Sequence, residues 1–248
     1  MNNAIVGLVR GYEDKSLYDK LIKRNLLLHE FVTDKFKLDY PYVLFHEGNI
    51  SLNDQSYIRY ESHNDNIIFV DVSKHWDSNI RGYINMCRFN SFYIWDYCKD
   101  FDYIMRVDDD CYITKCEINP FDSIGNNVFL YSFLFSETNK GTNLTLPTYI
   151  EHLTGIESKK FYTQFPYTNV YLSSVDFWHD KDINAMLKKI SINNWQVTYR
   201  WGDVPILGCL LNLYADGRIS YIKGMEYIHS SANEAVLTYP LNIRYDLP

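Results

Sequence analysis

The sequence has few cysteines, little excess positive charge and no long run of apolar residues. Its five cysteines include no Cys-x-x-Cys pair, so we expect neither a cysteine-based zinc site nor a dense disulfide framework. No stretch near the N-terminus resembles a signal peptide or a membrane anchor. The net charge of −7 argues against a general nucleic-acid binder. What is present, 46% hydrophobic and 17% aromatic residues, is typical of a globular enzyme.

Apolar runs alternate with amphipathic segments along most of the chain. Strands are expected at 4–9, 41–45, 66–71, 103–107, 127–135, 170–177, 219–222 and 227–229, and helices at 14–34, 52–60, 80–97, 145–155, 182–190 and 203–214. This alternation predicts an α/β fold with a mixed, mainly parallel central sheet, whose ligands bind at the carboxyl ends of the strands. Because there is no internal repeat or linker, we expect one domain over residues 1–248.

One expected strand ends in three adjacent acids, Asp108, Asp109 and Asp110. Carboxylates this close repel one another and lose hydration when packed, so a divalent cation is a simple way to hold them together. In an extended segment Asp108 and Asp110 point the same way and can share one Mn²⁺ or Mg²⁺ ion. A solvated acidic turn is the alternative. The apolar strand that precedes the acids favours the metal site.

Four short segments occur together in the order and approximate spacing of a known family. They are Met86-Cys-Arg-Phe89, Arg106-Val-Asp108, Arg200-Trp-Gly-Asp-Val-Pro205 and Tyr227-Ile-His229. Between Tyr83 and His229 the sequence therefore resembles the fungal α-1,2-mannosyltransferases of the Golgi. The resemblance implies a single-domain GT-A fold, with a donor-nucleotide half at about 1–125 and an acceptor half at about 126–248. It also implies transfer of mannose from GDP-mannose with retention of configuration.

The resemblance assigns a metal role to two residues that lie far apart in the sequence. The metal-binding Glu of the family corresponds to Asp108, and its distant metal-binding His corresponds to His229, with Asp110 as an additional ligand. Without the resemblance, His229 would be taken for an ordinary core or surface histidine. Arg81 and Arg88 are candidates for contact with the nucleotide diphosphate, because guanidinium groups pair with phosphate oxygens. The resemblance places Arg10, just after the first strand, at the nucleotide base and ribose, and Asp109 is a further residue expected to bind the nucleotide. For Arg88, an ion pair with one of the three acids is an alternative that is compatible with this role.

Three residues are candidates for the catalytic half of the site. Asp203 begins an expected helix and is predicted either to accept hydrogen bonds from the acceptor sugar or to act only as the N-cap. Where the family has a Glu that has been considered the nucleophile, this chain has Tyr171. Three routes to retention stay open. They are front-face displacement without a protein nucleophile, attack by Tyr171, and approach of Asp176 or Glu151 to the anomeric carbon.

The sequence therefore predicts a metal-dependent retaining glycosyltransferase with a nucleotide sugar and a glycan or glycoprotein acceptor as partners. Two alternatives remain. One is a transferase that uses another donor such as a UDP-sugar, and the other is an inactive nucleotide- or carbohydrate-binding module, which Tyr171 keeps open. We expect neither a nucleic-acid partner nor a membrane span. The expected location is the cytoplasm if the chain is full-length, and the Golgi lumen if it is a domain of a longer chain.

Overall fold

A seven-stranded sheet with the strand order β10-β6-β9-β4-β1-β2-β3 forms the centre of the molecule. The computed structural model describes residues 1–158, 164–230 and 236–237. The strands of this sheet are β1 (Asn3–Val9), β2 (Tyr42–His46), β3 (Ile67–Asp71), β4 (Tyr103–Val107), β6 (Phe129–Tyr131), β9 (Val170–Ser174) and β10 (Ile219–Tyr221). Only β9 among them runs antiparallel to its neighbours, β4 and β6. The expected mixed, mainly parallel α/β sheet is confirmed.

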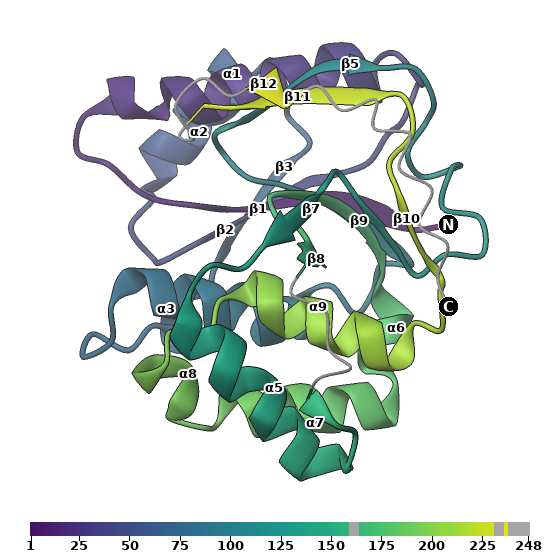
Figure 1. Cartoon of the computed structure of the whole chain (residues 1–248). Helices are drawn as coiled ribbons and strands as arrows, with labels where there is room; N and C mark the ends of the chain where they lie inside the picture. Colours follow the sequence, from purple (N-terminus) through teal and green to yellow (C-terminus); the bar gives the residue numbers. More distant parts are fainter. Residues whose placement is uncertain (159–163, 231–235, 238–248) are drawn as a thin grey trace.

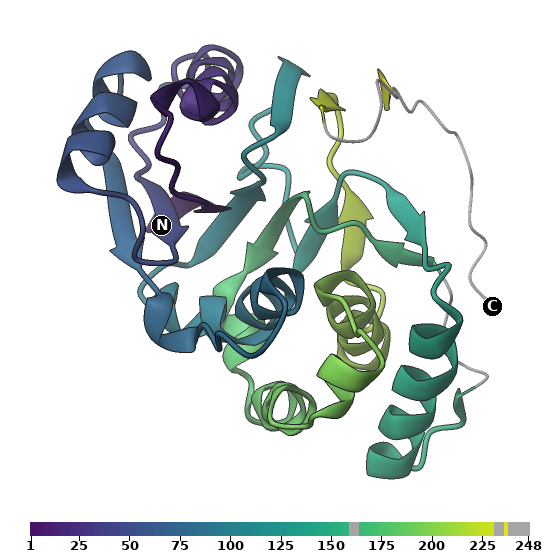
Figure 2. The ribbon, with the colours of Figure 1, turned by 90° about the vertical axis from the view of Figure 1, so that its left-hand side faces the viewer.

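Helices cover both faces of this sheet (Figure 1; Figure 2). Above it in Figure 1 lie α1 (Asp19–Leu28), α2 (Leu52–Glu61) and a second sheet made of β5 (Cys111–Cys116), β11 (Met225–His229) and β12 (Val236–Leu237). Below it lie α3 (Gly82–Arg88), α4 (Ile94–Tyr97), α5 (Lys140–Thr154), α6 (Val175–His179), α7 (Lys181–Ser191), α8 (Trp195–Thr198) and α9 (Asp203–Tyr214).

The alternation of side chains along β1 explains why the protein has a core on each side of the sheet. Ala4 and Val6 pack into one hydrophobic cluster, with the helices of the lower layer, whereas Ile5 and Val9 pack into the other. Successive residues of a strand point to opposite faces, and a strand buried on both faces is apolar throughout. The run at the start of the sequence therefore encodes a central strand.

Two expected strands differ in the structure. The strand predicted at 127–135 is two strands, because the chain leaves the central sheet after β6 and pairs β7 (Leu134–Ser136) with β8 (Gln164–Pro166) in a separate ladder. The strand predicted at 170–177 ends at Ser174, and α6 follows. Val175 and Trp178 are buried in this helix. A short apolar run does not distinguish a buried strand from a buried helix.

Three chain segments meet at the carboxyl end of β4. The acids Asp108–Asp110 connect β4 to β5, and the antiparallel partner of β5 is β11, whose last residue His229 lies opposite Cys111. On the other side of β4, Val170 pairs with Val107, so the start of β9 lies beside the same end. The topology thus brings together residues that are far apart in the sequence. None of the helices in the described ranges is both long and apolar enough to cross a membrane.

Candidate active site

The acidic turn after β4 is held by backbone contacts from two sides. The Asp108 N–H donates to the Asn169 carbonyl at 2.9 Å, and Arg24 of α1 donates through Nη2 to the Val107 carbonyl at 2.6 Å. Arg24 is fully buried, and its hydrogen bond to Val107 places its charge close to the acids. Burial, together with Asp108 and Asp110, raises the pKa of Asp109 to about 6. The turn therefore concentrates negative charge that a cation would stabilise.

Arg106 connects this turn to the opposite wall of the site. Its Nε and Nη2 both lie 2.9 Å from Oδ1 of Asp108, and its Nη1 donates to Oδ2 of Asp203 at 2.8 Å. The Arg106 side chain is only 3% exposed, and burial makes such charge-assisted contacts stronger than surface ion pairs. One guanidinium therefore binds two carboxylates, one in the turn that follows β4 and one in the first residue of α9.

Asp203 is the first residue of α9 and not its N-cap. Gly202 occupies the cap position, and the Asp203 side chain turns away from the helix end to accept from Arg106 and from Thr168 Oγ1, the latter at 2.9 Å. The expectation that Asp203 caps the helix is therefore wrong. Its side chain is 7% exposed and lies on the wall of a cavity, where it organises the surrounding groups.

Asp110 and His229 lie together, as the metal assignment requires. Oδ2 of Asp110 is 3.4 Å from Nε2 of His229, and this contact is the main reason why the pKa of His229 is raised. The thiol of Cys111 points to the same carboxylate, with Sγ 3.9 Å from Oδ1 of Asp110. The ligand atoms of all three residues lie within 4.8 Å of one another. Asp108 is not part of this group, and its Oδ1 accepts from Arg106.

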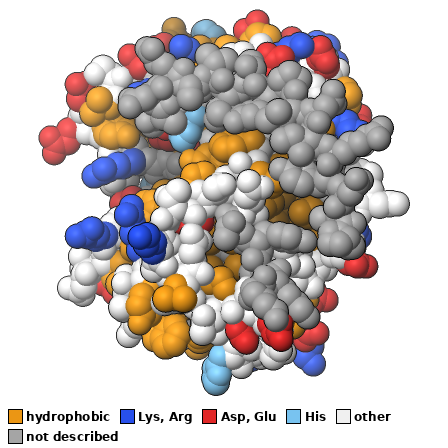
Figure 3. All heavy atoms as spheres, viewed as in Figure 1, with side chains coloured by type: hydrophobic (Ala, Val, Ile, Leu, Met, Phe, Trp, Pro, Cys, Tyr) orange, Lys and Arg blue, Asp and Glu red, His pale blue; other side chains and the backbone are white. Residues whose placement is uncertain are grey.

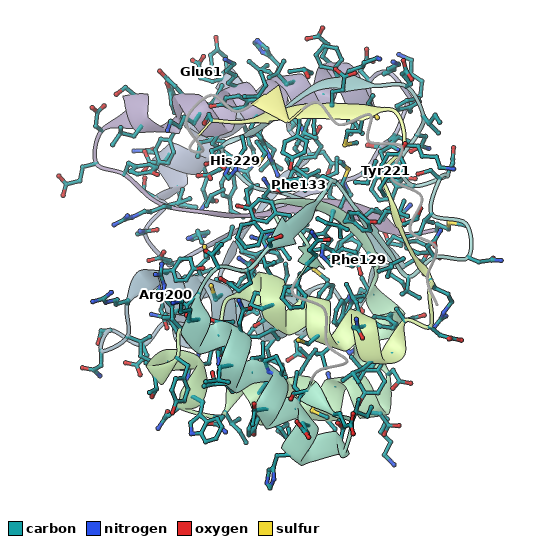
Figure 4. All side chains as sticks on the ribbon, viewed as in Figure 1. Glu61, Phe129, Phe133, Arg200, Tyr221 and His229 are labelled. Atoms are coloured by element: carbon teal, nitrogen blue, oxygen red, sulfur yellow. The ribbon has the colours of Figure 1, made fainter. Side chains whose placement is uncertain are left out.

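A cavity of about 420 Å³ opens between the acidic turn and α9. Its lining residues are Tyr83, Met86, Arg106, Asp108, Phe135, Glu137, Thr138, Asn139, Tyr167, Thr168, Asn169, Arg200, Gly202, Asp203, Val204 and Pro205. Three of the four segments noted in the sequence, Met86–Phe89, Arg106–Asp108 and Arg200–Pro205, thus contribute to one cavity. Figure 4 shows His229 at the end of β11 above this region and Arg200 below it.

Arg200 holds an unusual backbone conformation at the cavity. Its φ of 56° lies in the left-handed region, which costs about 1 kcal/mol or more for a residue with a Cβ. Its guanidinium lies 4.8 Å from the ring centroid of Tyr83, a cation–π contact. Lys and Arg side chains gather on the left of the face in Figure 3, the region where Figure 4 labels Arg200. The cavity therefore combines a positive side with an acidic turn.

The structure does not bring Tyr171 into the cavity. The side chain is fully buried, stacked on Phe129 at 4.8 Å between ring centroids, and the Arg106 guanidinium covers it at 5.9 Å. Tyr171 is the register partner of Arg106 and points to the same face of the sheet, but it is Arg106 that lines the cavity, while the tyrosine ring packs against the Arg106 guanidinium in the core. Burial also raises the pKa of Tyr171 well above its usual value. A nucleophilic role for Tyr171 is not supported by this placement.

The other two residues considered for attack on the anomeric carbon also lie elsewhere. Asp176 follows the end of β9 that pairs with Tyr103, at the opposite end of β4 from the acids. Five strand residues separate these ends by roughly 15 Å. Glu151 lies in the second half of α5, where its carboxylate accepts from the Ser158 N–H at 2.9 Å. Neither is among the residues that line the cavity.

The three arginines expected at the nucleotide differ in their surroundings. Arg10 is exposed immediately after β1, and Arg81 is exposed at the N-cap of α3. Arg88 is half-buried and its Nε donates to Oε1 of Gln196 at 3.3 Å. The ion pair with the acids that was considered for Arg88 is made by Arg106 instead. None of the three lines the cavity, so their role at the nucleotide remains a prediction.

Comparison with known proteins shows which fold this is. No family model matches the sequence, and no curated protein sequence matches it. Among solved structures, core-mannan synthase A from Aspergillus fumigatus in its Mn/GDP form is similar with a TM-score of 0.76 and 17% identity, over 92% of this chain and 74% of that one. The mannosyltransferase Ktr4p from S. cerevisiae gives a TM-score of 0.78 and 17% identity, over 92% and 70%. The chain has the GT-A glycosyltransferase fold.

More distant GT-A structures share the same framework. The galactosyltransferase LgtC, in complex with donor and acceptor sugar analogs, has a TM-score of 0.52 and 16% identity, over 88% of this chain and 72% of that one. This TM-score is well below the values of 0.76 and 0.78 for the mannosyltransferases. The likeness to the mannosyltransferases therefore extends beyond the shared central sheet. At these identities the comparison establishes the GT-A fold, as expected from the sequence.

Sequence reasoning missed several residues of the site. Arg106 was recognised in its segment without a role, although a charge in a buried strand usually has a buried partner. Arg200 was recognised in its segment without a role, and Tyr83, Tyr167 and Thr168 carried no local signal. Thr168 became visible only through its hydrogen bond to Asp203.

Proposed function

We propose that this protein is a metal-dependent retaining glycosyltransferase that moves a hexose, mannose from GDP-mannose, to a hydroxyl group of a glycan. The observation that carries the proposal is the cavity itself. The cavity joins the acidic turn after β4 to the Arg200–Pro205 segment. The fold around it is shared with mannosyltransferase structures, one in a Mn/GDP form and another in complex with GDP.

The donor set fits a divalent ion such as Mn²⁺. Adjacent ligand atoms of an octahedral ion with bonds of about 2.1 Å lie roughly 3 Å apart, and Oδ2 of Asp110 lies 3.4 Å from Nε2 of His229. These two residues would hold the ion, with Asp108 and Asp109 adding negative charge nearby. A bound ion supplies neutralisation of the charge that develops on the departing diphosphate.

The residues of the cavity would position the acceptor and exclude water. Asp203 is held by Arg106 and Thr168, so its carboxylate provides a fixed wall and not a mobile base. Arg200 and Tyr83 form the opposite, partly exposed edge. With Tyr171 buried, we propose front-face displacement, in which the leaving diphosphate takes the proton of the acceptor hydroxyl. The protein then contributes orientation and electrostatic stabilisation.

Thermal unfolding with nucleotides tests the donor. Saturation with Mn²⁺ and GDP at about 100 times the dissociation constant adds roughly 2.7 kcal/mol, which raises Tm by about 5–10 °C for a chain of this length. We expect the shift with GDP or GDP-mannose and little with UDP. Asp110→Asn and His229→Ala should remove its metal-dependent part. His152→Ala, an exposed histidine of α5, is the matched control and should keep the full shift.

The alternatives give different results in the same experiment. A shift with UDP and not with GDP would assign the protein to another donor, and no shift with any nucleotide sugar would favour an inactive module. Incubation of GDP-mannose with Mn²⁺ then tests turnover. Full hydrolysis or transfer by Asp110→Asn in the presence of a chelator would disprove the metal assignment. For an active protein, NMR of the product should show the anomeric configuration of the donor.

A further inference from the structure

The group formed by Asp110, Cys111 and His229 contains a sulfur atom that a manganese site does not need. Cys111 is fully buried at the first position of β5. Its thiol nevertheless has a polar neighbour, because it donates towards Oδ1 of Asp110. The β5–β11 ladder places Cys111 and His229 directly opposite each other. One carboxylate therefore lies between an imidazole and a thiol.

The spacing of these donor atoms matches a tetrahedral ion. With bonds of about 2.0–2.3 Å to O, N and S, tetrahedral zinc keeps its ligand atoms roughly 3.3–3.6 Å apart. The observed separations are 3.4 Å from Asp110 to His229 and 3.9 Å from Asp110 to Cys111, and all three lie within 4.8 Å. Side-chain movements of about 1 Å would complete three ligands, leaving a fourth position open.

We propose that Asp110, Cys111 and His229 form a Zn²⁺ site that binds zinc more tightly than manganese, so that zinc displaces the ion required for transfer. The zinc site rests on the geometry, and only its inhibitory effect rests on the proposed function. The sequence offered no sign of it, because the three ligands follow no zinc-binding spacing and lie on two strands.

The chemistry follows from the softness of sulfur. Thiolates prefer zinc over the harder manganese ion, and zinc also stands above manganese for nitrogen and oxygen donors. On binding, the Zn–S bond forms as the S–H bond of Cys111 breaks, and the proton leaves to solvent. No oxidant or reductant takes part. Burial and the neighbouring acids raise the pKa of the Cys111 thiol, so the ion must displace this proton.

Cobalt provides a direct readout of the sulfur ligand. The protein is treated with a chelator and titrated with Co²⁺, which reports a thiolate ligand through a near-ultraviolet charge-transfer band. We expect this band to saturate at one ion per chain and to disappear when Zn²⁺ is added. It should be absent in Cys111→Ala and retained in Cys116→Ala, a buried thiol at the other end of β5. A wild-type protein without the band, or a band that survives in Cys111→Ala, would overturn the proposal.

Calorimetric titration measures the selectivity. We expect wild-type protein to bind Zn²⁺ at least about 100-fold more tightly than Mn²⁺, and Cys111→Ala to weaken zinc by about tenfold or more while manganese changes by less than about threefold. In addition, one equivalent of Zn²⁺ should release Mn²⁺, seen as the return of the free-ion EPR signal. Equal loss of both ions in Cys111→Ala would contradict the sulfur ligand.

The outcomes for the two proposals are separable. The cobalt band in wild-type protein needs no nucleotide and no variant, so it stands even if Cys111→Ala fails to fold. If the band appears but Mn²⁺ and GDP give no thermal shift, the zinc site holds and the proposed transferase fails. If the shift appears without the band, the transferase holds and the zinc site fails.

Discussion

Replacing Arg106 by Met should destabilise the protein strongly and in a pH-dependent way. Methionine keeps most of the volume but removes the only cation seen, within the described ranges, to form an ion pair with Asp108 or Asp203. Breaking a buried ion pair by removing one partner costs about 3–5 kcal/mol, because a charge is left buried and uncompensated. At this site two carboxylates lose their partner. We therefore expect a loss of about 4 kcal/mol at pH 7.

The pH dependence follows from Asp108. Burial raises the pKa of Asp108 while Arg106 lowers it, so the variant should have a still higher folded-state value. A carboxyl whose folded pKa lies above its unfolded value of about 3.9 contributes stability that is complete below that value and is lost as pH rises through the folded pKa. The difference between Arg106→Met and wild type should therefore shrink towards pH 4.

Urea unfolding followed by tryptophan fluorescence and circular dichroism at pH 4, 5.5, 7 and 8 measures both effects. Arg59→Met is the matched control. Arg59 donates to the Ile67 carbonyl at 2.9 Å and forms no ion pair with any residue that the structure describes, so its loss should cost about 1 kcal/mol. An Arg106→Met loss below about 1 kcal/mol at pH 7, or a difference that does not shrink on acidification, would refute the view that Arg106 compensates both carboxylates.

Three further predictions follow from individual residues. Burial lowers the pKa of His46, so stability should fall as pH drops below about 6.5, and this fall should be smaller in His46→Asn, measured as urea midpoints between pH 7 and 5. Gly208→Ala should cost about 1–2 kcal/mol despite the better helix propensity of Ala, because its Cβ would overlap the Phe165 ring; a Tm above that of wild type would contradict this packing. Arg200→Gly should change the free energy of unfolding by less than about 1 kcal/mol, because relief of the left-handed backbone offsets the greater chain entropy of glycine in the unfolded state. Transfer to the acceptor should fall at least about tenfold. Kinetics with the full activity of wild type would exclude a role at the cavity.

Much of the central sheet could be predicted because its strands are apolar on both faces. This pattern identified the first strand and the segment ending at Val107. Apolar residues at helical spacing identified the region 80–97, and all three segments form the expected type of element. β5 was not predicted, since Cys111–Cys116 carries two exposed polar residues and is stabilised by pairing with a distant strand. Local sequence does not specify such a partner.

Some residues of the candidate site could likewise be predicted from the sequence, and others could not. The acidic turn was found because three carboxylates directly follow an apolar strand, whereas His229 was found only through the resemblance to a known family. The structure brings Asp110 and His229 together. Tyr171 was misplaced because sequence alignment gives a position in the strand but not the packing around it, and here the ring is buried against Arg106. The link from Arg106 to Asp203 depends on where α9 docks, which no pattern in either segment encodes.

The β5–β11 ladder has a consequence for how the protein is made. During synthesis β5 emerges long before β11, so the edge that pairs with β11 stays open until Met225–His229 has been translated. Such an edge is open to wrong pairing with other chains. β9 likewise inserts late between β4 and β6. The two halves therefore interlock, and a fragment that ends near residue 125 should aggregate instead of folding as a nucleotide-binding unit.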